Sequence, residues 1–275
     1  MSYLLDENGV RENTINLIEL SLSADQWQSN ANKVDNLRAQ LQKHSLFNHP
    51  MIRILSEKKL SLAAVQIIHL EYQHSIVEIF TDALLMTQFQ AKQLDDKLFA
   101  SIKMYARFLI TFNILDEFGF TFQPDQQITP LNAHFCLFKE VLKDLNISRD
   151  MVKSYIYSFE SIALRNFLEQ SYDNYAKLAL LLAVGEQQVI AFSPPLRKSF
   201  EQLGFATNKG YYQVHGVTQD IMTQAADDLH EDDLWILLTQ ALNFYNAAEL
   251  EQAAIKYCDL WEQFWDRMQQ IALTK

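Results

Sequence analysis

Four ionisable side chains lie on otherwise apolar faces of expected helices, and all four are glutamate or histidine. Burying a charge costs several kcal/mol unless it is paired or bound to a metal ion, so these positions stand out. At about 100° per residue, each of them shares a row with apolar, aromatic or amide side chains. The four residues are Glu117, in the row of Ala106, Ile110 and Asn113; Glu186, in the row of Tyr175, Ala179, Leu182 and Ile190; His134, at the head of Leu137, Phe138, Val141 and Leu145; and His215, after Tyr211 and Tyr212.

These side chains are suited to holding a metal ion. Carboxylate oxygens and imidazole nitrogens bind iron, manganese or zinc, and helical bundles build such sites from inward-facing residues on separate helices. Each residue alone also has a structural interpretation. A buried histidine is usually a hydrogen-bonded core residue, and a glutamate on an apolar row often packs its stem while its head reaches water. The metal site is therefore predicted on the condition that the four helices converge.

Other candidate residues fit a ligand set less well. Glu71, His74 and Glu78 share a helical face that we expect to be solvated, while His69 lies on the opposite, apolar side and either lines a cavity or packs. The acidic run 227–233 is expected to be a solvated junction between helices. Neither a Gly-rich phosphate loop, nor a Gly-x-Ser-x-Gly elbow, nor a His-Glu-x-x-His pair occurs in the sequence, so hydrolase and nucleotide-binding functions lack support.

The elements that must position these residues are predicted to be helices throughout. The chain has 275 residues, 49% of them hydrophobic, yet only 6 Gly and 5 Pro, too few turn residues for a sandwich, barrel or doubly wound sheet. Apolar residues recur at helical spacing, which predicts an all-α fold. Gly119 is expected to end a helix, Ser148 to cap one, and Pro194-Pro195 to force a turn. The main helices are expected over 24–43, 62–88, 96–118, 131–145, a stretch reaching 192 with a break near Gln170, and 211–275 with breaks near His230 and Asn246.

The sequence is expected to form one domain, in which residues 1–44 are an N-terminal helical extension and residues 45–275 the main body. The net charge of −11 argues against nucleic acid and anionic membrane as partners. Two cysteines, Cys136 and Cys258, cannot form a disulfide framework or a cysteine zinc site. Neither a secretory signal nor an 18-residue apolar stretch is visible, so we expect a cytoplasmic protein without a membrane span.

Several segments resemble one superfamily. Residues 49–84 resemble the opening helices of the TenA/PqqC and heme-oxygenase-like proteins. NILDEFGF (113–120) followed by HFCLFKEVL (134–142) resembles the Asp-Glu-x-Gly … His-x-x-Leu-Phe pattern of the heme-oxygenase-like diiron oxidases and oxygenases, in which the Glu and the His bind iron. LLLAVGEQQVI (180–190) and GYYQVHGVTQDIM (210–222) match the later ligand helices. The resemblance covers roughly residues 45–235 and implies a TenA-like helical bundle with iron ligands at Glu117, His134, Glu186 and His215.

The last motif departs from the family pattern. The family's Asp falls on Gln219 and its second His on Met222, which offer a neutral amide oxygen and a soft sulfur unsuited to a hard iron centre. His230 would lie about 22 Å beyond His215 on a straight helix, too far to share the metal. A mononuclear site of two His and one or two Glu is compatible with these residues, and so is a site that no longer holds metal. Gln219, Met222, His69 and Tyr211 are expected to line the pocket.

The resemblance implies a non-heme iron-dependent oxidase or oxygenase, with one or two ions, that acts on a small organic substrate. The alternative is a metal-free protein that keeps the fold, has lost the metal chemistry, and binds a small molecule or a partner protein. A TenA-like hydrolase is less well supported, since Cys136 and Cys258 lie outside the matched positions. A homodimer is expected only because dimers are common in the superfamily. Convergence of Glu117, His134, Glu186 and His215 on a common point would favour the metal site.

Overall fold

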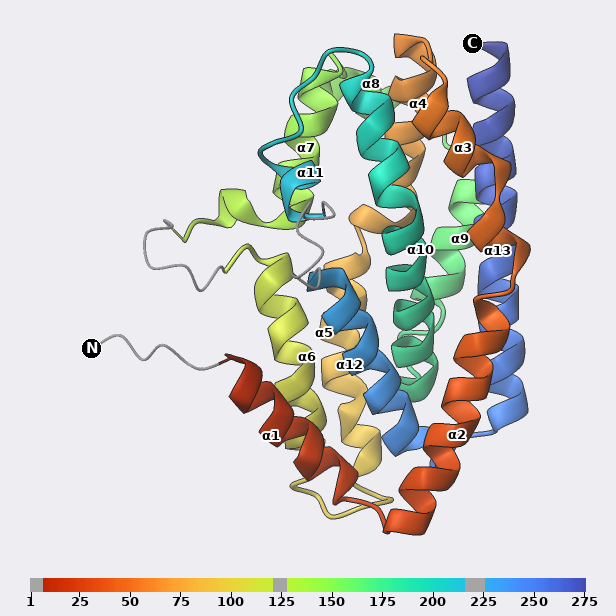
Figure 1. Cartoon of the computed structure of the whole chain (residues 1–275). Coiled ribbons are helices and arrows are strands. Elements are labelled where there is room, and N and C mark those ends of the chain that lie inside the picture. Colours follow the sequence, from red (N-terminus) through yellow and green to blue (C-terminus); the bar gives the residue numbers. More distant parts are fainter. Residues whose placement is uncertain (1–6, 121–127, 216–225) are drawn as a thin grey trace.

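The computed structural model describes residues 7–120, 128–215 and 226–275; for residues 7–8 and 226–228 it describes the backbone only. Within these ranges the chain is a bundle of helices without a strand, as predicted (Figure 1). Short 3-10 or π turns join some of the helices. The α-helices are α1 (Glu7–Glu19), α2 (Ala24–Leu41), α3 (Pro50–Glu57), α4 (Leu62–Tyr72), α5 (Phe80–Gln90), α6 (Lys103–Glu117), α7 (His134–Asp144), α8 (Arg149–Ser154), α9 (Phe159–Glu169), α10 (Tyr175–Glu201), α11 (Tyr211–Val214), α12 (Ala226–Ala241) and α13 (Ala247–Thr274).

Helix α10 is the centre of the bundle. It packs against α3, α5, α12 and α13 (Figure 1). Nearly every residue from Tyr175 to Val189 is buried. Its length and composition would suffice to cross a membrane, but 83% of its most apolar window is covered by the rest of the protein. An apolar helix of this kind is what the middle of a helical bundle requires, because neighbours surround it on all sides.

The prediction that Pro194-Pro195 forces a turn is wrong, because α10 continues through both prolines to Glu201. A proline inside a helix removes a backbone hydrogen bond and usually bends or breaks the helix. Here Pro195 and Leu196 are both buried in the bundle. Tertiary packing of these residues therefore outweighs the local preference for a turn.

The helix expected over 62–88 is instead divided by a π turn at Gln73–Val77, where the Glu78 N–H donates to the Gln73 carbonyl at 3.1 Å. This fifth-residue hydrogen bond admits one extra residue and rotates the chain before α5 starts at Phe80. Hydrophobic spacing does not reveal such a turn, because the apolar residues on both sides keep helical periodicity. The turn brings Ile76 and Val77 to the candidate site described below.

The prediction that Glu71 lies on a solvated face of its helix is wrong, because Glu71 is only 1% exposed. Its carboxylate accepts hydrogen bonds from the Tyr155 hydroxyl at 2.7 Å and from the Ser158 N–H and hydroxyl, both at 3.0 Å. These donors come from the segment between α8 and α9. This segment covers the helical face that was expected to be in contact with solvent. Burial of this carboxylate is therefore offset by hydrogen bonds.

Several predicted helix ends are confirmed and one break is not. Gly119 has a φ of +74° after α6, the Ser148 hydroxyl accepts from the Met151 N–H at the start of α8, and the Asn246 side chain caps α13. Each of these residue types satisfies backbone groups that a helix end leaves without a partner. The break expected near His230 is wrong, since α12 is continuous from Ala226 to Ala241.

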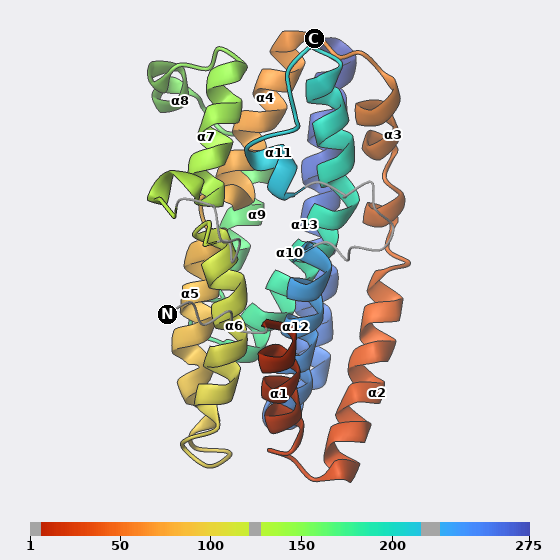
Figure 2. The same ribbon diagram turned by 60° about the vertical axis from the view of Figure 1, so that its left-hand side comes forward.

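The N-terminal helices lie on the outside of the bundle, where α1 packs on α6 and α12, and α2 packs on α12 and α13 (Figure 2). Ile18, Val34 and Leu41 from these helices belong to the same continuous apolar core as α10. The extension is thus a packed layer on the body, and the boundary at residue 44 stays a prediction.

Candidate metal centre

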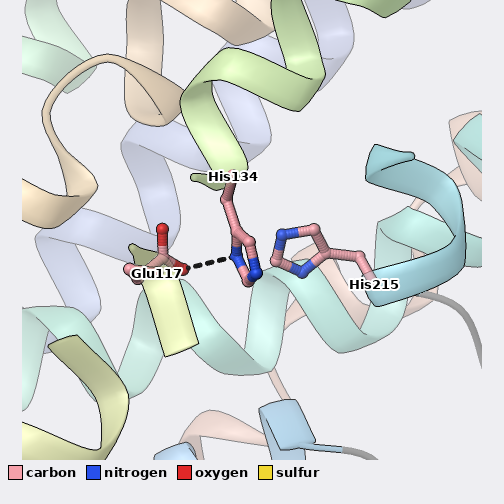
Figure 3. A group of neighbouring side chains, drawn as sticks. All are labelled: Glu117, His134 and His215. Atoms are coloured by element: carbon pink, nitrogen blue, oxygen red, sulfur yellow. Dashed lines mark hydrogen bonds and ion pairs between the residues drawn. The ribbon is translucent and has the colours of Figure 1, made fainter. Parts of the chain in front are cut away.

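Three of the four candidate ligands, Glu117, His134 and His215, come together from three different elements (Figure 3). Glu117 is the last residue of α6, His134 the first of α7, and His215 follows α11 directly. One ligand atom from each of the three lies within 4.8 Å of the other two, and their side chains are almost fully buried. Two imidazoles and one carboxylate thus share one small volume inside the protein.

The contact between Glu117 and His134 has the spacing of two ligands on one ion. Glu117 Oε1 and His134 Nδ1 are 3.1 Å apart. Two atoms that each lie about 2.1 Å from a metal are separated by about 3.0–3.4 Å, so this pair fits without rearrangement. The other ring nitrogen, Nε2, lies 3.8 Å from Asp116 Oδ2. This distance is too long for a hydrogen bond, so Asp116 acts on the imidazole through its charge.

Glu117 and His134 lie close together because the backbone just after α6 passes very near the backbone just before α7. Gly119 ends α6 two residues after Glu117, and a Cβ at Gly119 would lie 2.4 Å from the carbonyl oxygen of Asn132. Only glycine allows both the positive φ and this approach. Because Asn132 lies two residues before His134, the same crossing brings the end of α6 to the start of α7.

The electrostatic surroundings keep Glu117 ionised. Burial alone would raise the pKa of Glu117, but the charge of His134 and its hydrogen bond, with the charges of His215 and His230, hold that pKa below its usual value. His134 and His215 meet edge to face with ring centroids 4.6 Å apart. A divalent cation can replace those positive charges beside the carboxylate, with the imidazoles then bound to it in their neutral form.

Glu186 faces the same cavity but stands apart from the group of three. Its Oε1 accepts a hydrogen bond from Asn113 Nδ2 at 3.2 Å and lies 3.9 Å from His230 Nδ1. The prediction that His230 is too distant is therefore wrong. That estimate assumed one straight helix from His215 to His230, whereas α11 ends at Val214 and α12, which begins at Ala226, packs along α10 and brings His230 to Glu186.

The cavity between these residues has a volume of about 20 Å3. A space of this size holds an ion or a water molecule, since one water needs about 10–15 Å3 by this measure. Polar side chains occupy one part of the wall and apolar or aromatic side chains the rest. The lining residues are Tyr72, Ile76, Val77, Phe80, Glu117, His134, Glu186, Val189, Tyr211 and His215.

The four residues expected to line the pocket have different outcomes. Tyr211 lies at the cavity, with its ring centroid 4.4 Å from that of His215. His69 is not part of the lining; it is buried, with Nδ1 2.8 Å from the Val65 carbonyl and Nε2 2.5 Å from the Tyr212 hydroxyl. Gln219 and Met222 lie outside the described residues.

A second group with metal-binding atoms, His44, Asp259 and Glu262, lies between the end of α2 and α13. Both ring nitrogens of its histidine already have hydrogen-bond partners. His44 Nδ1 accepts from the Leu46 N–H at 3.2 Å, so the proton sits on Nε2, which lies 3.2 Å from Asp259 Oδ1. This imidazole caps the following turn and donates to the carboxylate, which explains the cluster without a metal.

The sequence matches no family model and no curated protein. Among solved structures, the crystal structure of a TenA homologue from Pseudomonas syringae pv. tomato str. DC3000 superposes with a TM-score of 0.60 at 18% identity. The similarity covers 89% of this chain and 93% of that one. Similarity at this identity reports on the fold alone: the chain is an all-α bundle of the TenA and heme-oxygenase type.

Proposed function

We propose that this protein is a non-heme iron-dependent oxidase or oxygenase that acts on a small organic substrate. The observation that carries the proposal is the convergence of Glu117, His134 and His215 in one buried cavity. Two imidazoles and a carboxylate are the ligand types of the non-heme iron oxygenases, in which the remaining coordination positions stay open. The donors are hard or borderline, so iron, manganese and zinc suit them better than copper(I) does.

The iron, when bound, would supply the activation of dioxygen. The protein's own residues provide the charge, the orientation and the exclusion of water. Glu117 contributes one negative charge, and the carboxylate of Asp116, 3.8 Å from His134 Nε2, adds a second negative charge beside that imidazole. The aromatic ring of Tyr211 packs on His215, and the apolar wall includes Ile76 and Val77. An apolar wall limits the access of water to reactive species at the site.

The size of the cavity bears on the metal-free alternative only where that protein binds a small molecule, since a partner protein would not need a cavity. Pockets for organic ligands usually measure about 300–1,000 Å3, far more than the 20 Å3 found here. The cavity fits an ion, so the substrate of the proposed enzyme is expected to approach the ion from the rim. Gln219 and Met222 remain the features that favour a protein without metal.

Metal content tests the proposal directly. The protein would be expressed with added iron, purified without chelator, and measured by elemental analysis beside His215→Ala and His44→Ala. We expect at least one iron per chain in the wild type, with one lost in His215→Ala. His44→Ala removes a histidine from the other candidate cluster and should keep the wild-type content. A folded wild-type protein without bound iron would overturn the metal function.

A further inference from the structure

A groove lies between the two N-terminal helices and α12, on the outside of the bundle. Helices α1 and α2 each pack on α12, and residues 20–23 join the two of them at one end (Figure 1). The space between the three helices has a volume of about 790 Å3, within the range of about 300–1,000 Å3 that organic ligands usually occupy. Among the described residues, its lining and that of the metal cavity have no member in common.

The two arginines of the groove are paired with carboxylates of α12. Arg11 Nε donates to Asp233 Oδ1 at 2.9 Å, and its Nη2 lies 2.8 Å from Asp233 Oδ2. Arg38 Nη1 lies 2.8 Å from Asp232 Oδ1, and its Nη2 lies 3.0 Å from Glu231 Oε1. The positive charges on the wall are thus already neutralised by the protein itself, so an anionic ligand would have to displace these carboxylates.

Three further carboxylates line the groove, Glu12 and Glu19 on α1 and Asp35 on α2. None of the three has an ion-pair partner in the part of the chain that the structure describes. Glu12 and Glu19 are two turns apart on one face of α1, which separates them by about 10 Å along the helix axis. With five carboxylates and two arginines, the lining has a net charge of −3. Such a surface attracts an organic cation and repels an anion.

The inner wall of the groove carries a charge that its own partner does not fully compensate. Asp233 is 3% exposed, and burial raises its pKa to about 7 even though the charge of Arg11 acts in the opposite direction. A positive group in the groove would favour the ionised carboxylate. The prediction that the acidic run 227–233 is a solvated junction is therefore wrong for Glu231 and Asp233, which are both buried.

The surface between these charges is apolar. Val34 and Trp235 are buried at the base of the groove, and Ile15, Trp27 and Ile236 are partly buried along it. Apolar side chains of this kind pack against methylene groups, and the faces of aromatic rings also attract ammonium groups. A ligand that matches both features has an apolar chain with positive charges at both ends.

We propose that this groove binds an aliphatic polyamine. The methylene chain lies over Ile15 and Trp27, and the ammonium groups meet Glu12, Glu19 and Asp35. A chain with positive charges at both ends can reach Glu12 and Glu19 together, whereas a monoamine can reach only one of them. The site requires no metal ion, so it stands or falls separately from the proposed oxidase or oxygenase function.

Calorimetric titration of the full-length protein with three probes tests the class of ligand. Spermidine has positive charges along an apolar chain, octylamine has one positive charge, and octanoate has a negative charge on a similar chain. At low salt, where screening is weak, we expect about one spermidine per chain, and binding of octylamine that is about ten-fold or more weaker. Octanoate should not bind. Octylamine or octanoate binding as tightly as spermidine would overturn the proposal.

Variants of the groove test the position of the ligand. Glu12→Gln combined with Glu19→Gln removes both carboxylates of α1 and should weaken spermidine about ten-fold or more. Asp96→Asn combined with Asp150→Asn removes two exposed carboxylates elsewhere, changes the net charge equally, and should bind spermidine as the wild type does. Asp35→Asn should also weaken spermidine, so the test survives if the α1 variant fails to fold. Equal affinities of the groove variants and the control variant would overturn the proposal, because binding would then depend only on the overall charge.

Discussion

At the level of single residues, the same type of side chain serves different purposes depending on its partners. His134 and His215 meet a carboxylate in a cavity, whereas His69 is surrounded by a backbone carbonyl and a tyrosine. A carbonyl only accepts, so His69 Nδ1 donates to Val65 and Nε2 accepts from the Tyr212 hydroxyl. The neutral imidazole satisfies both contacts, which makes His69 a core residue.

His69 should give the protein a measurable dependence on acid. Burial lowers the pKa of His69 to about 4, against a usual value of 6.5. His69 therefore stays neutral in the folded protein at a pH at which it takes up a proton in the unfolded chain. The contribution of the neutral His69 to the free energy of unfolding is fully present above pH 6.5. It is lost as the pH falls from 6.5 to 4, by about 3 kcal/mol in all. Urea unfolding between pH 7.5 and 4.5 should show a shallower loss for His69→Gln than for the wild type. Parallel curves would contradict this assignment.

Glu71 provides a second test at a single residue. Glu71→Gln would turn an amide N–H2 toward donors from Tyr155 and Ser158 that now meet a carboxylate. We expect a loss of about 2–4 kcal/mol in the free energy of unfolding, because buried donors lose a charged acceptor. Glu140→Gln is the control, since its ion pair with Lys143 is exposed and should contribute little to the free energy of unfolding. Equal urea midpoints for the two variants would contradict the structural role of Glu71.

At the level of elements, the sequence predicted the helices well where capping residues and glycine mark the ends. It failed where packing decides, as at the π turn after Tyr72 and at the two prolines of α10. Both failures have one cause. Local preferences are worth a few kcal/mol at most, and burial in a bundle can override them. The residues near the site that depend on these features, such as Ile76 and Val77, were accordingly missed.

Two glycines near the site should respond in opposite ways to alanine. A Cβ at Gly119 would clash with the backbone of Asn132 and strain a positive φ, so Gly119→Ala should lose about 2 kcal/mol or more and weaken metal binding at Glu117 and His134. A Cβ at Gly185, inside α10, would meet Phe80 at an ordinary 3.8 Å. Gly185→Ala should therefore gain about 0.5–1 kcal/mol. Urea midpoints check both, and a neutral Gly119→Ala would contradict the proposed crossing of α6 and α7.

At the level of the whole molecule, the sequence could supply ligand types but not the distances between them. The apolar rows single out Glu117, His134 and His215 as candidates, and only the structure shows that these three lie together. His230 was rejected because a straight helix was extrapolated across a gap between two elements. Its approach to Glu186 depends on how α12 packs on α10, which is a tertiary contact that helical spacing does not encode.

The packing of the N-terminal layer predicts that the protein unfolds as one unit. Leu41 of α2 and Leu180 of α10 are both fully buried in the same continuous core. Leu41→Ala and Leu180→Ala should each lower the free energy of unfolding by about 2–4 kcal/mol in one shared transition. Far-UV circular dichroism and tryptophan fluorescence should give coincident urea midpoints for each variant, since Trp27 reports on the layer and Trp261 on the body. If the layer were a separate unit, Leu41→Ala would shift an early transition of the fluorescence and leave the main one at the wild-type midpoint.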